Sequence, residues 1–234
     1  MFFILAFLRR KTVADAAAGA VPEYLVRVDP HGSVRELQAV DLAMNRYADG
    51  NVAAFAEVFA ALAPRLRLFL RRLGCAVDLA DDLTQETFLR MHHARGSFAS
   101  GKPVAPWAYA IARNCFISHA RSSRNKLARA SVDSDEVELS AGASGGVEEE
   151  SMARQSAEVV SRTLAAMTPA RREAFILLRY EGLSVAAAAE VVGISEGALK
   201  IRAFHAYELL RAALAGMGAD SVAAEASNQP AAET

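Results

Sequence analysis

The stretch from Gly182 to Arg202 constrains the fold more than any other part of the chain. Ser184 can cap the apolar run 185–192 as a short helix, Gly193 can break that run, and Ser195 offers a second capping hydroxyl. This order predicts a helix-turn-helix, whose second helix stands free to enter the major groove of DNA. An ordinary helical hairpin is the alternative that the stretch alone leaves open.

The rest of the chain also favours helices. Hydrophobic residues make up 53% of its 234 residues, and apolar side chains recur at intervals of three and four from about residue 49. Pro64 interrupts this pattern, so it either starts a second helix or kinks the first. The length and the periodicity predict an all-α protein with two small helical domains.

The formal net charge of −1 hides an uneven distribution. Residues 131–151 contain seven acidic residues, no Lys or Arg, and a run of Gly, Ala and Ser. Such a segment buries little apolar surface, so we expect a flexible acidic linker there. It divides the folded part into domains at 45–130 and 152–215.

The two ends carry weaker patterns. Residues 1–44 are expected to form a poorly defined extension, and Met44 is an alternative start of the folded part. The apolar run 2–8 precedes its positive charges and is too short for a span of roughly 20 residues, so no stable membrane insertion is expected. The last helix should end near Leu214, and residues 216–234 should form a disordered tail.

No enzyme chemistry is indicated. The two cysteines, Cys75 and Cys115, lie far apart and in no metal-binding pattern, and the histidines lack metal-ligand spacing. Ser123 and Lys126 match S-x-x-K, but no partner motif accompanies them. We therefore expect a protein of the reducing cytoplasm that has no catalytic residue, no metal and no cofactor.

Two helices present polar faces beside apolar ones. In DDLTQETFLR at 81–90, Leu83, Thr87 and Phe88 should face inward, while the acidic and amide side chains lie outward. PWAYAIARNCFISHAR at 106–121 combines basic residues with aromatics at its start, which suits phosphates and unstacked bases. A solvated charged face is the simpler interpretation of a lone helix of this kind.

Taken together, these segments resemble a sigma factor of bacterial RNA polymerase, of the extracytoplasmic-function (ECF) class in the sigma-70 family. The segment at 81–90 resembles the polymerase-binding helix of the family, and 106–121 resembles its promoter-melting helix. LAAMTPARREAFILLRYEGLS at 164–184 and GISEGALKIR at 193–202 resemble its second domain.

The resemblance implies three sets of site residues. Binding of core polymerase is implied for Asp82, Gln85, Glu86 and Arg90. Binding of the minus-10 element, where the non-template strand melts, is implied for Trp107, Tyr109, Arg113, Asn114, Ser118, His119, Arg121 and Arg124. Binding of duplex at the minus-35 element is implied for Arg171, Arg172, Ser195, Glu196, Ala198, Lys200 and Arg202. An anti-sigma protein is implied as a further partner.

Two other functions are compatible with part of the sequence. A free-standing helix-turn-helix regulator would bind its operator without polymerase, but it leaves the polar face at 82–90 unexplained. An all-α adaptor, whose exposed faces bind other proteins, predicts no dependence on promoter DNA.

Overall fold

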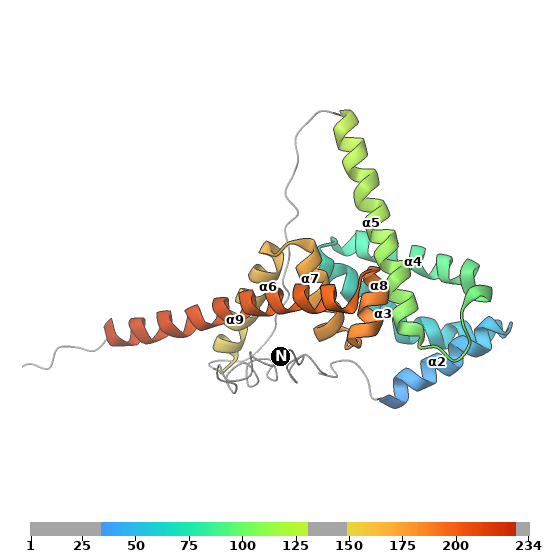
Figure 1. The fold of residues 1–234 in the computed structure, drawn as a ribbon, viewed down its shortest axis with the longest axis horizontal. Coiled ribbons are helices and arrows are strands. Elements are labelled where there is room, and N and C mark those ends of the chain that lie inside the picture. Colours follow the sequence, from blue (N-terminus) through green and yellow to red (C-terminus); the bar gives the residue numbers. More distant parts are fainter. Residues whose placement is uncertain (1–33, 131–148, 228–234) are drawn as a thin grey trace, which may run out of the picture.

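A computed structural model describes residues 34–130 and 149–227 (Figure 1). Within these two ranges every regular element is a helix, which confirms the predicted all-α class. The predicted linker lies outside the described residues, except for 149–151, which begin a helix. The extension before Val34 also lies outside them.

The first half of the described chain, residues 34–130, forms a bundle of four α-helices. These are α2 (Val34–Ala48), α3 (Phe55–Leu73), α4 (Val77–Ala94) and α5 (Val104–Ala130), with 3-10 turns at Val52–Ala54 and Arg95–Ser97. Pro64 lies inside α3, so the alternative that it starts a second helix is wrong. The core includes Leu66, Phe69 and Met91, each at most 1% exposed.

Helix α2 corrects the predicted boundary of the first domain. We placed residues 1–44 in an extension, but α2 begins at Val34 and buries Val40, Ala43 and Met44 in the core. These apolar residues, with Tyr47, recur at intervals of three and four, as on one face of a helix. A chain that started at Met44 would therefore lose most of α2.

Helix α2 also holds the start of α5. The first backbone N–H groups of a helix have no partner within it, and negative charge is favourable beside them. Asp41 Oδ1 accepts a hydrogen bond from the N–H of Val104 at 2.8 Å, so a residue of another helix caps α5. Desolvation raises the pKa of Asp41, and the hydrogen bond from Val104 opposes this shift. Asn45 Oδ1 accepts from the N–H of Gly101 at 3.2 Å and fixes the preceding loop.

Replacing Asp41 by alanine is expected to lower the free energy of unfolding by about 1–2 kcal/mol, because the cap and its charge are lost together. Asp41→Asn keeps an oxygen acceptor and should cost less. Urea denaturation of full-length protein measures both, with Asp49→Ala at an exposed position as the control. An Asp41→Ala protein as stable as the control would contradict the capping role.

The second half of the described chain, residues 149–227, consists of shorter helices packed around its last helix. These are α6 (Glu149–Ala166), α7 (Pro169–Phe175), a π-helical turn (Ile176–Tyr180), α8 (Val185–Val192) and α9 (Glu196–Ser227). Helices α6 and α7 lie against α9, with Met167, Phe175, Tyr207 and Leu210 between them (Figure 1).

Helix α9 is longer than predicted. We expected the helix to end near Leu214 and a disordered tail at 216–234, but α9 continues to Ser227. Alanine is frequent from 212 to 226, and alanine has the highest helix propensity. Residues 228–234 lie outside the described part of the chain.

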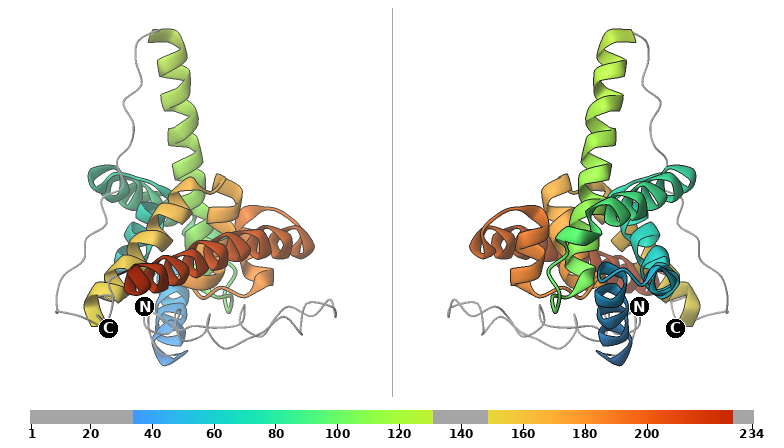
Figure 2. Two further views of the ribbon diagram at one scale, coloured as in Figure 1. Left: turned by 90° about the vertical axis from the view of Figure 1, so that its left-hand side faces the viewer. Right: turned by 90° about the vertical axis from the view of Figure 1, so that its right-hand side faces the viewer.

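The two halves pack directly against each other. Helix α8 lies against α5, and α7 lies against α3 (Figure 2). One continuous core contains Phe69 and Tyr109 of the first half together with Ile176 and Leu199 of the second. The two predicted helical domains therefore meet in this structure and share buried surface.

Candidate nucleic-acid interface

The helix-turn-helix has the predicted local structure. Ser184 Oγ accepts a hydrogen bond from the N–H of Ala187 at 3.1 Å and caps α8. Gly193 ends α8 in the left-handed region with φ +76°, which favours glycine. Ser195 Oγ accepts from the N–H of Ala198 at 3.3 Å at the start of α9. The predicted capping roles of Ser184 and Ser195 and the helix-breaking role of Gly193 are confirmed. Ser195 and Glu196, at the start of α9, are exposed.

The predicted minus-35 residues at the start of α9 lie on two flanks of the helix. Ser195, Ala198 and Arg202 follow one flank at intervals of three and four, while Glu196 and Lys200 follow the other. Ser195 and Glu196 are exposed, and Ala198, Lys200 and Arg202 are half-buried. Lys200 Nζ lies 3.9 Å from a carboxylate oxygen of Glu196.

The centre of the outward face belongs to residues that sequence analysis missed. Leu199 and Ala203 are buried, and the helical period places Gly197 and Ile201 opposite them. The side chain of Ile201 is 59% exposed, and Phe204 and His205 are exposed one turn later. If Leu199 is taken as the inward-facing residue, helical spacing places Ile201, two residues later, on the outward side. This spacing could have identified Ile201 from the sequence.

Arg172 is not placed to contact DNA. Its guanidinium donates hydrogen bonds to the main-chain oxygens of Ala165 at 2.5 Å, Met167 at 3.2 Å and Leu73 at 3.3 Å. Desolvation lowers the pKa of this arginine. The predicted phosphate contact of Arg172 is therefore contradicted in this structure, because the side chain joins α3, α6 and α7 instead. Arg171 is half-buried in the first turns of α7.

Half of the predicted minus-10 residues lie on one face of α5. Trp107, Asn114, Ser118 and Arg121 succeed one another at intervals of seven, four and three, which places them on one side of a helix. The last three are exposed, and Trp107 is half-buried against Phe98, with 5.1 Å between ring centroids. The later part of helix α5 projects away from the rest of the bundle (Figure 1).

Tyr109 and Arg113 lie on a different face, which meets the second half of the chain. Tyr109 is 1% exposed and its hydroxyl donates to Glu181; burial raises its pKa well above the ordinary value. Arg113 Nε and Nη2 donate to the two carboxylate oxygens of Glu173 at 2.5 Å and 3.2 Å. In this closed arrangement neither residue can contact DNA, because the packing of the two halves occupies both side chains.

Two further minus-10 residues stand apart. His119 is exposed away from the face of Asn114, and its Nε2 lies 3.3 Å from Ser123 Oγ. The side chain of Arg124 lies outside the part of the chain that the structure describes.

Helix α4 presents the predicted polar face. Asp82, Gln85 and Arg90 are exposed, and Glu86 accepts a hydrogen bond from Arg90 Nε at 2.7 Å. Among these polar side chains Leu89 is 57% exposed, and sequence analysis had not selected it. Leu89 therefore lies on the same exposed face as the predicted polymerase-binding residues.

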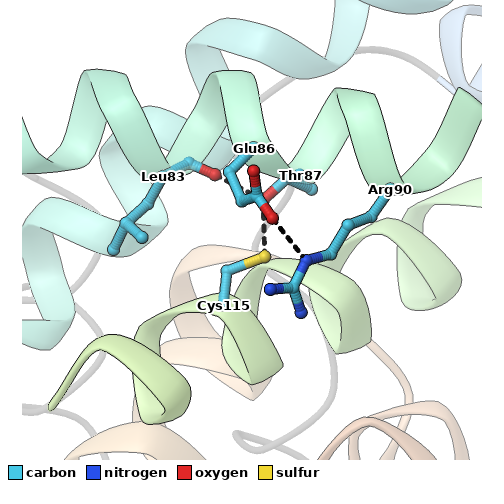
Figure 3. Close-up of polar contacts among 5 residues, drawn as sticks. All are labelled: Leu83, Glu86, Thr87, Arg90 and Cys115. Carbon is cyan, nitrogen blue, oxygen red and sulfur yellow. Dashed lines mark hydrogen bonds and ion pairs between the residues drawn. The ribbon is translucent and has the colours of Figure 1, made fainter. Parts of the chain in front are cut away.

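The opposite side of α4 is fixed to α5. Thr87 Oγ1 donates to the carbonyl of Leu83 at 2.6 Å and lies 3.8 Å from Cys115 Sγ (Figure 3). Burial raises the pKa of the Cys115 thiol, so this cysteine is a weak nucleophile that serves packing. The contact sets the position of the α4 polar face relative to the exposed face of α5.

Within residues 34–130 and 149–227, which the structure describes, no helix is both long and apolar enough to cross a membrane. Two family models match the chain: sigma-70 region 2 over residues 58–126 and sigma-70 region 4 over residues 157–210. The first match covers the faces on α4 and α5, and the second covers the helix-turn-helix.

The chain is similar to known sigma factors over most of its length. It is 34% identical to the RNA polymerase sigma factor CarQ of Myxococcus xanthus, over 72% of this chain and 93% of that protein. It is also 34% identical to the ECF RNA polymerase sigma factor SigF of Caulobacter vibrioides, over 71% and 89%.

Two solved structures share the fold. The sigma factor RpoE in complex with the anti-sigma factor NepR from Bartonella quintana has a TM-score of 0.58 at 26% identity, over 68% of this chain and 96% of that one. CnrH in complex with the cytosolic domain of CnrY has a TM-score of 0.55 at 25% identity, over 76% and 98%.

Proposed function

We propose residue roles on the premise that this chain belongs to the ECF class of the sigma-70 family of RNA polymerase sigma factors. The chain is a transcription initiation factor that binds core RNA polymerase and promoter DNA. Sigma factors are not enzymes, so the chemistry of RNA synthesis belongs to the polymerase. The chain would act in the cytoplasm, where the polymerase is.

The observation that carries the assignment is the exposed face of α5 on the same chain as the helix-turn-helix. Asn114 and Ser118 offer hydrogen-bonding groups for base edges, Arg121 offers a cation for phosphate, and Trp107 lies at the end of the face as a stacking surface. Unstacking a base costs a few kcal/mol, and stacking and phosphate contacts offset that cost. We assign this face to the melted non-template strand of the minus-10 element.

The other two surfaces complete the proposal. The α4 face with Asp82, Gln85 and Leu89 would bind core polymerase, and the start of α9 would read duplex at the minus-35 element. We place the first domain at 34–130, which includes α2, and the second at 152–215. Two weak DNA contacts on one polymerase-bound chain gain effective concentration, so the spacing of the elements contributes to specificity.

Co-elution with core polymerase tests the proposal most simply. The purified chain should form an equimolar complex with core polymerase, and an excess of another sigma factor should displace it from that complex. Separate elution would reject the polymerase role. A free-standing regulator, which would explain only the helix-turn-helix, also predicts separate elution, together with specific duplex binding by the chain alone.

An anti-sigma protein is a further proposed partner. Two structurally similar sigma factors, RpoE and CnrH, are seen with NepR and with the cytosolic domain of CnrY. The exposed apolar side chains of α9, which include Phe204 and Leu209, offer surface for such a protein.

Ile201 is expected to read thymine in the minus-35 element. Its exposed branched side chain lies at the centre of the outward face of α9, and apolar side chains contact the C5-methyl group of thymine in the major groove. Ile201→Ser should reduce the preference for thymine at one position by about five-fold or more. Selection of minus-35 sequences by polymerase holding either protein measures this change.

The matched control for that experiment is Leu209→Ser, an exposed leucine two turns farther along α9. An unchanged sequence preference with Ile201→Ser, alongside unchanged core binding, would exclude a reading role for Ile201.

A further inference from the structure

Two carboxylates of the second domain reach cations of the first. Glu181, directly after the π-helical turn, has no exposed side-chain surface. Its Oε1 lies 2.9 Å from Arg72 Nη1 of α3, and its Oε2 accepts a hydrogen bond from the hydroxyl of Tyr109 in α5. Glu173 of α7 binds Arg113 through two hydrogen bonds, with side chains that are 11% and 19% exposed.

Further contacts surround these pairs. The guanidinium carbon of Arg72 lies 4.1 Å from the ring centroid of Tyr180, and Arg172 Nη1 donates to the carbonyl of Leu73. Burial raises the pKa of Glu181, while Tyr109 and Arg72 oppose that shift by stabilising the carboxylate. Buried charges stay in place only when they are paired, so the closed arrangement of the domains depends on these partners.

We propose that Glu173 and Glu181 form an interdomain latch with Arg113, Arg72 and Tyr109, which keeps the free chain closed and competes with nucleic-acid phosphate for Arg113. The proposal rests on the proposed function. Arginine binds carboxylate and phosphate through the same paired N–H geometry, so a phosphate group can replace Glu173 on Arg113.

The latch should be specific without being strong. A buried ion pair gains Coulomb energy but loses the hydration of both groups, and the two terms largely cancel. Separation of the domains rehydrates the carboxylate and the guanidinium together and leaves neither group buried alone. The latch therefore fixes the closed arrangement while polymerase and promoter can open it.

Closing changes what the chain offers to DNA. Asn114, Ser118 and Arg121 stay exposed in the closed chain, whereas Arg113 faces Glu173. The closed chain thus withholds one cation of α5 that lies beside this face. Opening would free Arg113 on the neighbouring face of α5 and would also expose Arg72.

Charge reversal in full-length protein tests the latch. Glu173→Arg sets two guanidinium groups against each other, so small-angle X-ray scattering should show a larger radius of gyration. Affinity for a fluorescent single-stranded 20-mer of mixed sequence should rise about five-fold or more over Glu158→Arg, which makes the same charge change at an exposed site of α6. The double change Glu173→Arg, Arg113→Glu should restore the smaller radius.

Glu173→Gln keeps the size of the side chain but removes its charge. It should increase the radius of gyration and the DNA affinity less than Glu173→Arg does. Because this variant is less disruptive, it shows whether misfolding explains the result of the arginine variant. Equal radii and equal DNA affinities for Glu173→Arg, Glu173→Gln and Glu158→Arg would overturn the latch. Core binding is measured in parallel: a larger radius without core binding would support the latch and reject the sigma-factor role.

Discussion

Replacing Asn114 and Arg121 together by alanine is expected to reduce promoter-dependent transcription by at least about 100-fold. The two side chains lie on the exposed face of α5, two turns apart. Each contact to a base or phosphate contributes about 1–3 kcal/mol, and every 1.4 kcal/mol is a factor of ten. Both residues are exposed, so the free energy of unfolding should change by less than about 0.5 kcal/mol.

The defect should lie in promoter opening. Co-elution with core polymerase should be unchanged, and permanganate should no longer detect unpaired thymines near the transcription start. Arg162→Ala, at an exposed arginine of α6, serves as the matched control. Normal transcription by the double variant would show that the α5 face does not hold the melted strand.

Asp82→Lys is expected to weaken binding of core polymerase by at least about 30-fold. Asp82 is exposed on the polar face of α4, and a reversed charge within a charge-complementary interface costs several kcal/mol. The loss should diminish at high salt, because the contact is between solvent-accessible charges. Titration of labelled protein with core polymerase at two salt concentrations measures both effects.

The control for this change is Asp49→Lys, which reverses an exposed charge in the turn after α2. It should bind core polymerase as the unchanged chain does. If Asp82→Lys also binds normally, another surface carries the polymerase contact, and Leu89 would lose its proposed place beside it.

The helix-turn-helix could be predicted because its signals are local. Ser184 and Ser195 each accept a hydrogen bond from an N–H three residues ahead, and Gly193 takes the one conformation that favours glycine. Such contacts are determined by a few neighbouring residues. The polar and apolar faces of α4 followed from helical spacing in the same way.

The environment of Tyr109 and Arg113 could not be predicted, because their partners are distant in sequence. Glu181 follows Tyr109 by 72 residues and Glu173 follows Arg113 by 60, and only the packing of the domains brings them together. Helical spacing alone could still have shown that both residues lie off the face of Asn114. The buried residues of α2 are a second example. Their helical spacing is present in the sequence, but the predicted first domain was not extended to include the residues before Met44.

Transcription from a genomic fragment library tests the central assignment most directly. Core polymerase with and without this chain would transcribe the library, and sequencing would map the transcript starts. We predict new starts that share two upstream elements at one fixed spacing and that disappear with Asn114→Ala, Arg121→Ala. The absence of new starts, together with failure of the chain to bind either core polymerase or promoter DNA, would contradict the assignment and favour the adaptor.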